Sequence, residues 1–183
     1  MEGSAIVSLL SYGTVLAQAA TLVLLVLLVR DWRAGWRDAF TTWLHRNGLG
    51  LAGAVALAAA LGSLALSGLV GYAPCKLCWY QRSFMYPLAV ILPMAAWLRD
   101  RRIIRYALAL VLVGGFVALN HTILQGGGTS LIPCSAPGIG TQGCDQRFVF
   151  EFGFVTVPLM SLTAFSLVAV LLGHASSVVR AKR

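Results

Sequence analysis

Long apolar segments separated by short polar ones dominate the chain. A membrane-crossing helix needs about 20 consecutive apolar residues, and lipid offers the backbone no hydrogen bonds outside a helix or a closed barrel. The segments are rich in Leu, Ala and Val and lack the alternation of barrel strands. They are Ser4–Val29, Leu49–Tyr72, Trp79–Leu98 (which includes Arg82), Tyr106–Leu124 and Phe152–Gly173. The pattern predicts an all-α membrane protein with five transmembrane helices, a four-helix bundle plus one additional N-terminal helix.

Composition supports membrane residence. Only 11% of the 183 residues are charged, whereas a soluble domain carries about 25%. Ala17 to Ala19 resembles a signal-peptide cleavage site. However, the first residues, "MEGSA", contain no basic side chain, and the apolar segment continues to Val29. We therefore interpret the first segment as a retained helix.

The basic residues are distributed unevenly between the two sides of this five-helix arrangement. The net charge is +8, and only Lys76, Arg82 and Arg147 lie on the side that carries the N-terminus. Because cytoplasmic loops collect Lys and Arg, the pattern predicts a cell-membrane protein with an extracytoplasmic N-terminus and a cytoplasmic C-terminus. The alternation of basic and non-basic loops also argues against nucleic acid as a partner. We expect membrane lipid to surround the helices.

Three regions follow from this arrangement. Residues 1–46 comprise the additional helix and a connector, residues 47–174 the four-helix bundle, and residues 175–183 a basic cytoplasmic tail. The aromatic spacing of the connector predicts a short amphipathic helix in the headgroup layer. Its aromatic residues are Trp32, Trp36, Phe40 and Trp43. The glycine-rich segment 125–151 is the one substantial loop, and such loops are often functional.

The four cysteines form two pairs on the extracytoplasmic side of this arrangement, Cys75 with Cys78 and Cys134 with Cys144. Disulfides persist in that compartment, and an even number of cysteines favours them. Covalent haem attachment is excluded because Trp79 replaces the histidine of C-x-x-C-H. A four-cysteine zinc site and a purely structural loop disulfide remain open alternatives.

The surroundings of the C-x-x-C pair favour redox chemistry. Pro74 precedes the pair, so Cys75 and Cys78 should lie in the first helical turn, where the helix dipole favours a thiolate. Arg82 follows Cys78 by four residues and shares its helix face, although it can also be read as a snorkelling arginine. His121 lies at similar depth on the next helix, where it can also be a simple interfacial histidine. Together these groups could hold a membrane-soluble acceptor with two carbonyl oxygens, which is the chemistry of a quinone.

At these residues the sequence resembles a known family. The stretch "PCKLCWYQRSFMYPL" is similar to the signature of DsbB-type disulfide bond formation proteins, especially the BdbC-like branch. "NHTILQ" and "FVTVPLMSL" resemble the family's histidine motif and its last helix. The resemblance covers about Leu49 to Gly173, and its first motif is the most specific.

The resemblance implies a thiol:quinone oxidoreductase that generates disulfides. Such a protein reoxidises an extracytoplasmic thioredoxin-fold thiol oxidase of the DsbA or BdbD type. It passes the electrons to ubiquinone or menaquinone, and through the quinone pool to the respiratory chain. The implied site residues are the catalytic Cys75, Cys78, Cys134 and Cys144 and the quinone-binding Arg82 and His121. Cys78 would be the thiolate beside the quinone, and Cys134 the sulfur that bonds the partner.

Two other functions remain as alternatives. Vitamin K epoxide reductases use similar parts, but their loop pair precedes the C-x-x-C, whereas here the C-x-x-C comes first. A membrane scaffold or transporter subunit with structural disulfides is the non-enzymatic alternative, although no acidic residue lies within the apolar segments. The chain departs from the family pattern in its additional first helix, in its short Cys134–Cys144 loop and in Asn120, which stands where an aromatic residue is expected.

Overall fold

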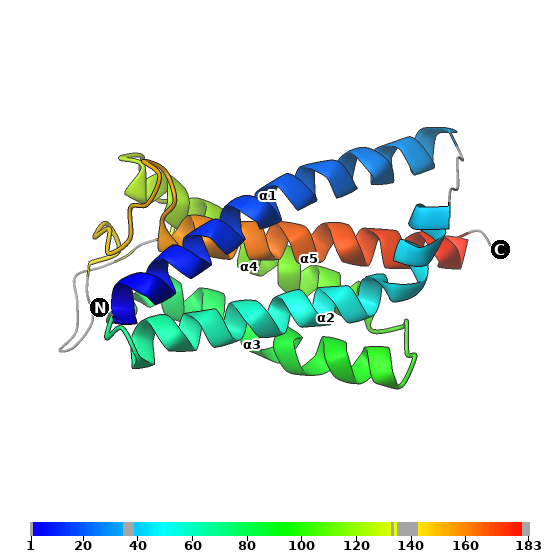
Figure 1. Cartoon of the computed structure of the whole chain (residues 1–183), viewed down its shortest axis with the longest axis horizontal. Coiled ribbons are helices and arrows are strands. Elements are labelled where there is room, and N and C mark those ends of the chain that lie inside the picture. Colours follow the sequence, from blue (N-terminus) through cyan, green and yellow to red (C-terminus); the bar gives the residue numbers. More distant parts are fainter. Residues whose placement is uncertain (1, 35–38, 133, 135–142, 181–183) are drawn as a thin grey trace.

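The structure is a computed structural model that describes residues 2–34, 39–132, 134 and 143–180. Across these residues it is helical, with one isolated β-bridge between Glu151 and Val155. The helices are α1 (Glu2–Ala34), α2 (Ala39–Gly68), α3 (Lys76–Trp97), α4 (Ile104–Gln125) and α5 (Val157–Arg180) (Figure 1). The predicted all-α class is confirmed.

Four helices, α1, α2, α4 and α5, are long and apolar enough to cross a membrane. Such a set of helices suits a multi-pass membrane protein. Helix α3 carries Lys76 and Arg82 in its first two turns and Pro87 and Pro93 further along, and it falls outside that set. A fifth crossing, through α3, stays a prediction.

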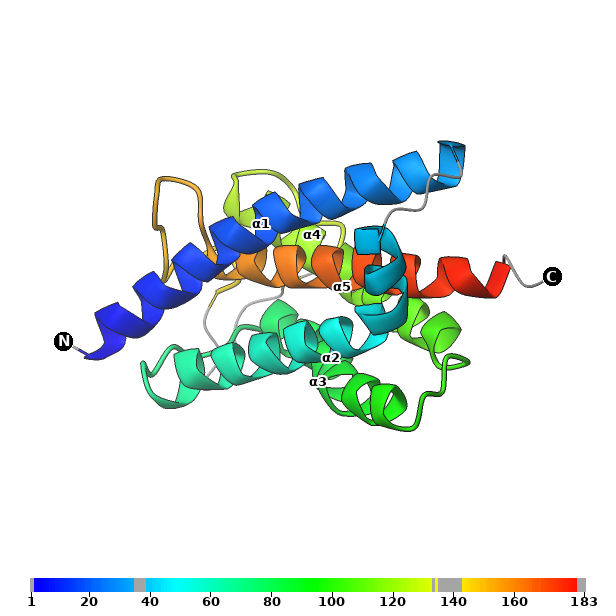
Figure 2. The ribbon, with the colours of Figure 1, turned by 45° about the vertical axis from the view of Figure 1, so that its right-hand side comes forward.

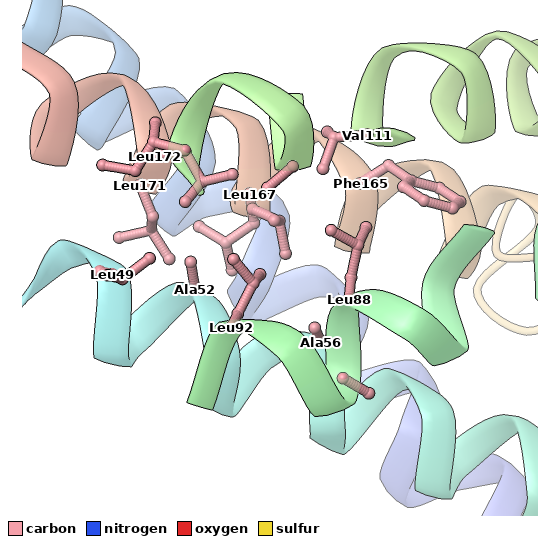
Figure 3. Close-up of a cluster of buried hydrophobic side chains, with 14 of the residues drawn as sticks. Leu49, Ala52, Ala56, Leu88, Leu92, Val111, Phe165, Leu167, Leu171 and Leu172 are labelled. Carbon is pink, nitrogen blue, oxygen red and sulfur yellow. The ribbon is translucent and has the colours of Figure 1, made fainter. Parts of the chain in front are cut away.

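Helices α2 to α5 form a bundle around one apolar core. α2 packs against α3 and α5, and α4 packs against the same two helices. Figure 3 shows side chains from these helices meeting in the centre, including Leu88 and Leu92 of α3 and Phe165 and Leu172 of α5, all nearly inaccessible to solvent. Helices α2 to α5 thus share one continuous core, and the predicted bounds of the bundle at residues 47 and 174 stay predictions.

Small residues allow the helices to approach closely, as is common in membrane bundles. At Gly53 of α2, an added Cβ atom would lie 2.8 Å from the backbone nitrogen of Pro93 in α3. Any larger residue there would push α2 and α3 apart. This contact brings the two helices together in the half of the bundle away from the cysteines.

Helix α1 lies along the outside of the bundle and packs mainly on α5 (Figures 1 and 2). Midway along α1, the side-chain amide of Gln18 donates to Thr163 Oγ1 of α5 at 3.3 Å. Closer to its C-terminal end, Leu24 O accepts a hydrogen bond from His174 Nε2 at 2.9 Å. At that end Asp31 Oδ2 lies 3.7 Å from His45 Nε2 of α2. The first helix is therefore held to the bundle at several depths.

The predicted amphipathic connector helix is wrong for the residues that the structure describes. α1 continues to Ala34, and α2 begins at Ala39, well before the predicted start at Leu49. Phe40 and Trp43 consequently belong to α2. The early start has a packing reason, because Leu44 is 2% exposed in the first turns of α2. Trp36 and the Trp32 side chain lie outside the described residues.

The last helix begins later than predicted, at Val157 instead of Phe152. Phe152 and Gly153 have positive φ angles of 54° and 76°, which a helix cannot contain. They form a turn that is closed by hydrogen bonds between Glu151 and Val155. The ring of Phe152 packs edge-on against Tyr12 of α1, with 5.0 Å between centroids.

Candidate functional site

Cys75 and Cys78 form the first turn of α3, as the sequence predicts. Cys75 is the N-cap residue, with extended backbone angles, and its Sγ accepts the backbone N–H of Cys78 at 3.4 Å. A sulfur thus fills the role that a hydroxyl or carboxylate oxygen usually has at an N-cap. The two Sγ atoms are 3.0 Å apart and both residues are thiols. The cap holds the two sulfurs within hydrogen-bonding distance of each other.

His121, in the last turns of α4, contacts both cysteine pairs. Its Nε2 lies 3.7 Å from Cys75 Sγ and 3.0 Å from the backbone oxygen of Cys144. A carbonyl oxygen can only accept, so Nε2 carries the proton of this contact. His121 therefore joins α3 to the loop that follows α4.

Gln81 fixes the other side of the imidazole and was not anticipated from the sequence. Its Nε2 amide lies 3.0 Å from His121 Nδ1, and both residues are buried. Since Nε2 of His121 is the protonated nitrogen, Nδ1 accepts from the amide. The available sequence signal was spacing, because Gln81 lies one helical turn after Cys78.

The surroundings lower the pKa of Cys75, which precedes the apolar part of α3. The Cys78 thiol, by hydrogen bonding to the sulfur of Cys75, lowers this pKa from 9.0 to about 4. Burial opposes this shift, and the hydrogen bond of His121 reinforces it. The N-cap contact and His121 thus both act on Cys75. The assignment of Cys78 as the thiolate beside the quinone stays a prediction.

Arg82 points from α3 toward α2. Its Nε donates to Ser63 Oγ at 2.9 Å, and a terminal nitrogen donates to Ser63 O at 2.9 Å. The guanidinium also lies over the Trp79 ring, 5.3 Å from its centroid. The expectation that Arg82 shares a helix face with Cys78 is compatible with this arrangement. Ser63 is a partner that the sequence did not reveal.

Cys134 and Cys144 are joined by a disulfide. Cys144 is 3% exposed and packs in one cluster with Cys75, Leu77 and Val117, while Cys134 lies at the edge of that cluster and is partly exposed. The structure therefore brings all four cysteines together. The disulfide also takes up two of the four sulfurs that the alternative zinc site needs.

Polar contacts tie the cysteine loop to the end of α4. Asn120 Oδ1 accepts the backbone N–H of Leu131 at 3.2 Å, before the loop reaches Cys134. Beyond Cys144, the side-chain amide of Gln125 donates to Gln146 O at 2.8 Å. Asn120 departs from the family pattern in the sequence, and here it has a loop-binding role.

A cavity of about 370 Å³ opens beside the dithiol. This size is within the range of about 300–1,000 Å³ that is usual for small-molecule sites. Its walls are mostly apolar. The cysteine end carries Cys75, Cys78, Gln81, Arg82 and His121, and the lining also includes hydroxyl groups, such as those of Tyr86 and Ser161. The arrangement suits a flat apolar molecule with a few hydrogen-bond acceptors.

A helical membrane bundle that packs a disulfide against a dithiol defines a membrane protein of thiol–disulfide chemistry. The family model described as "Disulfide bond formation protein DsbB" matches residues 45–175, which is most of the chain. The protein belongs to this DsbB family of disulfide bond formation proteins and acts in membrane disulfide bond formation. The family assignment implies oxidoreductase activity.

Individual relatives support the assignment. A "Probable disulfide formation protein" of Metapseudomonas resinovorans is 41% identical over 139 residues, which cover 75% of this chain and 88% of the relative. "Disulfide bond formation protein C" of Bacillus subtilis (strain 168) is 38% identical over 118 residues, 63% of this chain and 83% of the relative. No solved structure matches the chain significantly.

Proposed function

We propose that the protein is a thiol:quinone oxidoreductase that reoxidises an extracytoplasmic thioredoxin-fold thiol oxidase and passes the electrons to a membrane quinone. The observation that carries the proposal is the packing of the Cys134–Cys144 disulfide against the Cys75/Cys78 dithiol, at the polar end of an apolar cavity. The topology inferred from charge would place this end on the extracytoplasmic side, where thiol partners are secreted.

The first step is exchange with the partner. A partner thiolate attacks Cys134, the more accessible sulfur of the loop pair, and forms a mixed disulfide while Cys144 leaves as a thiolate. The partner's second thiolate then attacks the mixed disulfide. This releases the oxidised partner and leaves Cys134 as a thiolate. The exposure of Cys134 relative to Cys144 supports this order.

The second step moves the disulfide within the protein. The Cys144 thiolate attacks Cys75 of an oxidised Cys75–Cys78 pair, and Cys78 leaves. Cys134 then attacks Cys144, which restores the loop disulfide and leaves Cys75 and Cys78 reduced. The contact of His121 with both Cys75 Sγ and Cys144 O supports Cys75 as the sulfur that is attacked.

The residues around the dithiol fit a quinone. The cavity is apolar along most of its length, and donors converge near the sulfurs from Arg82, Gln81 and His121. When bound, the quinone accepts two electrons and two protons from the dithiol, which restores the Cys75–Cys78 disulfide. Ser63 orients the Arg82 guanidinium, whose positive charge stabilises negative charge at this end of the cavity.

The purified protein tests this proposal directly. With a reduced thioredoxin-fold oxidase as donor, wild-type protein should reduce ubiquinone or menaquinone while the donor becomes oxidised in equal amount. Cys78→Ser should abolish quinone reduction. Normal quinone reduction by Cys78→Ser would refute the mechanism.

Trapping tests the order of exchange. The oxidised partner is used for trapping. In Cys144→Ser the Cys134 thiolate should attack the partner's disulfide and accumulate a mixed disulfide, because no Cys144 thiol remains to displace the partner. The matched variant, Cys134→Ser, should accumulate much less. Non-reducing electrophoresis measures the amount of adduct formed by each variant. More adduct with Cys134→Ser than with Cys144→Ser would assign the partner bond to Cys144.

A further inference from the structure

The cavity beside the dithiol extends away from the cysteines toward the middle of the bundle. Its deeper wall comes from α1, α2, α3 and α5, with Val55 of α2, Tyr86 of α3 and Leu167 of α5 among its residues. Helix α1 contributes one face, in which most residues are spaced by three or four positions as on a helix side. These residues are Leu9, Leu10, Gly13, Thr14 and Ala17.

This α1 face is effectively apolar. The hydroxyl of Thr14 donates to Leu10 O of its own helix at 2.7 Å. Across the cavity, the hydroxyl of Thr163 likewise donates to Leu159 O at 2.8 Å. Thr14 and Thr163 therefore offer the cavity mainly hydrocarbon contacts. The Tyr86 hydroxyl is a further donor in the cavity wall, besides those at the cysteine end.

Helix α1 also lies outside the region that matches the family model, which begins at residue 45. It is nevertheless fixed on the bundle by the hydrogen bond between Gln18 and Thr163 and by the ring contact between Tyr12 and Phe152. Leu10 approaches α2 closely at Gly62, where an added Cβ would lie 3.0 Å from a Leu10 methyl. Helix α1 thus forms a fixed part of the cavity wall.

We propose that α1 is a substrate-binding element that holds the hydrocarbon tail of the electron acceptor. This inference rests on the proposed function, which places the acceptor's ring at the cysteine end of the same cavity. An isoprenoid tail is apolar and flexible, and it would continue from the ring along the face formed by Leu10, Gly13 and Ala17. The helix then sets the affinity for long-tailed quinones, while the redox groups set the reaction of the ring.

Gly13 provides a direct test, because it lines the cavity where the cavity is exposed, and an added Cβ there meets no atom within 4 Å. Gly13→Leu should therefore narrow the open side of the cavity without a clash. The assay uses purified protein in detergent, dithiothreitol as electron donor, and two acceptors, a long-tailed ubiquinone and a tail-less water-soluble quinone. We expect the KM for the long-tailed quinone to rise about tenfold, which is about 1.4 kcal/mol, with an unchanged KM for the tail-less one.

Ala20→Leu is the matched control, since Ala20 is exposed on α1 and does not line the cavity. It should leave both KM values unchanged. If Gly13→Leu does not fold, Leu10→Ala replaces it. Loss of tail contacts in Leu10→Ala should also raise the KM of the long-tailed quinone alone.

The outcomes separate the two hypotheses. Equal KM changes for both quinones, or none for either, in the folded variant would overturn the role of α1 and leave the proposed function standing. Failure of wild-type protein to reduce either quinone would overturn the proposed function, and with it the premise of this inference.

Discussion

His121 is the residue whose replacement most directly probes the electrostatics of the dithiol. It is 1% exposed, and its Nε2 lies 3.7 Å from Cys75 Sγ. Its hydrogen bond lowers the pKa of Cys75, after the larger effect of the Cys78 thiol. In His121→Leu this contribution disappears, while the N-cap contact and the Cys78 thiol remain.

The size of the change follows from the contact. A hydrogen bond to a charged group contributes about 1.5–3 kcal/mol, and about 1.4 kcal/mol corresponds to one pKa unit. We therefore expect the pKa of Cys75 to rise by roughly one to two units in His121→Leu, from about 4 in the unsubstituted protein.

The sign of the pH dependence follows from the lowered pKa. Folding lowers the pKa of Cys75, so its thiolate stabilises the reduced folded protein fully above the pKa of an unfolded cysteine, near 8.5. This stabilisation declines as the pH falls below that value and is lost as it passes through about 4. In His121→Leu the loss should be complete at a higher pH.

The assay is the ultraviolet absorbance of the thiolate as a function of pH, in reduced protein with Cys134 and Cys144 both replaced by serine. The transition should vanish when Cys75 is also replaced. Thr122→Ala is the matched control, since the Thr122 hydroxyl bonds only to its own helix at Ala118 O. An identical transition in His121→Leu and in the control would refute the role of His121.

Two further substitutions test the packing and the arginine. Gly114→Ala should destabilise the protein by about 1–3 kcal/mol despite the better helix propensity of alanine, because the added Cβ would lie 2.4 Å from the buried Phe165 ring. Thermal unfolding in detergent measures this, and Gly115→Ala, whose Cβ would stand 3.6 Å from Phe165, should not show the loss. Ser63→Ala removes the Oγ that accepts from Arg82 Nε at 2.9 Å, a charged hydrogen bond of about 1.5 kcal/mol or more. We expect kcat/KM for the quinone to fall about tenfold, and an unchanged value would contradict the orienting role of Ser63.

Local sequence signals were sufficient for most of the fold and for the first turn of α3. Apolar length predicted the helices, because a chain in lipid must satisfy its backbone within each segment. Pro74 and the C-x-x-C spacing predicted a helix start with both cysteines in its first turn, and Cys75 caps that helix. Helix ends were less predictable. The start of α2 depends on burial of Leu44, and the start of α5 on the turn at Phe152 and Gly153.

The assembled site depended on tertiary structure. Sequence placed Cys75 and Cys78 on one helix turn, but only the packing of α3 against α4 brings His121 to Cys75 instead of Cys78. The sequence also did not reveal the hydrogen-bond partners, which are Ser63 for Arg82 and Gln81 for His121. These contacts depend on how neighbouring helices are rotated. Residue types and spacing determined which chemistry the chain carries. The rotation and approach of the helices decided which sulfur meets His121, which loop cysteine is buried beside it, and that the first helix lines the same cavity. These features depend on contacts between segments far apart in the sequence.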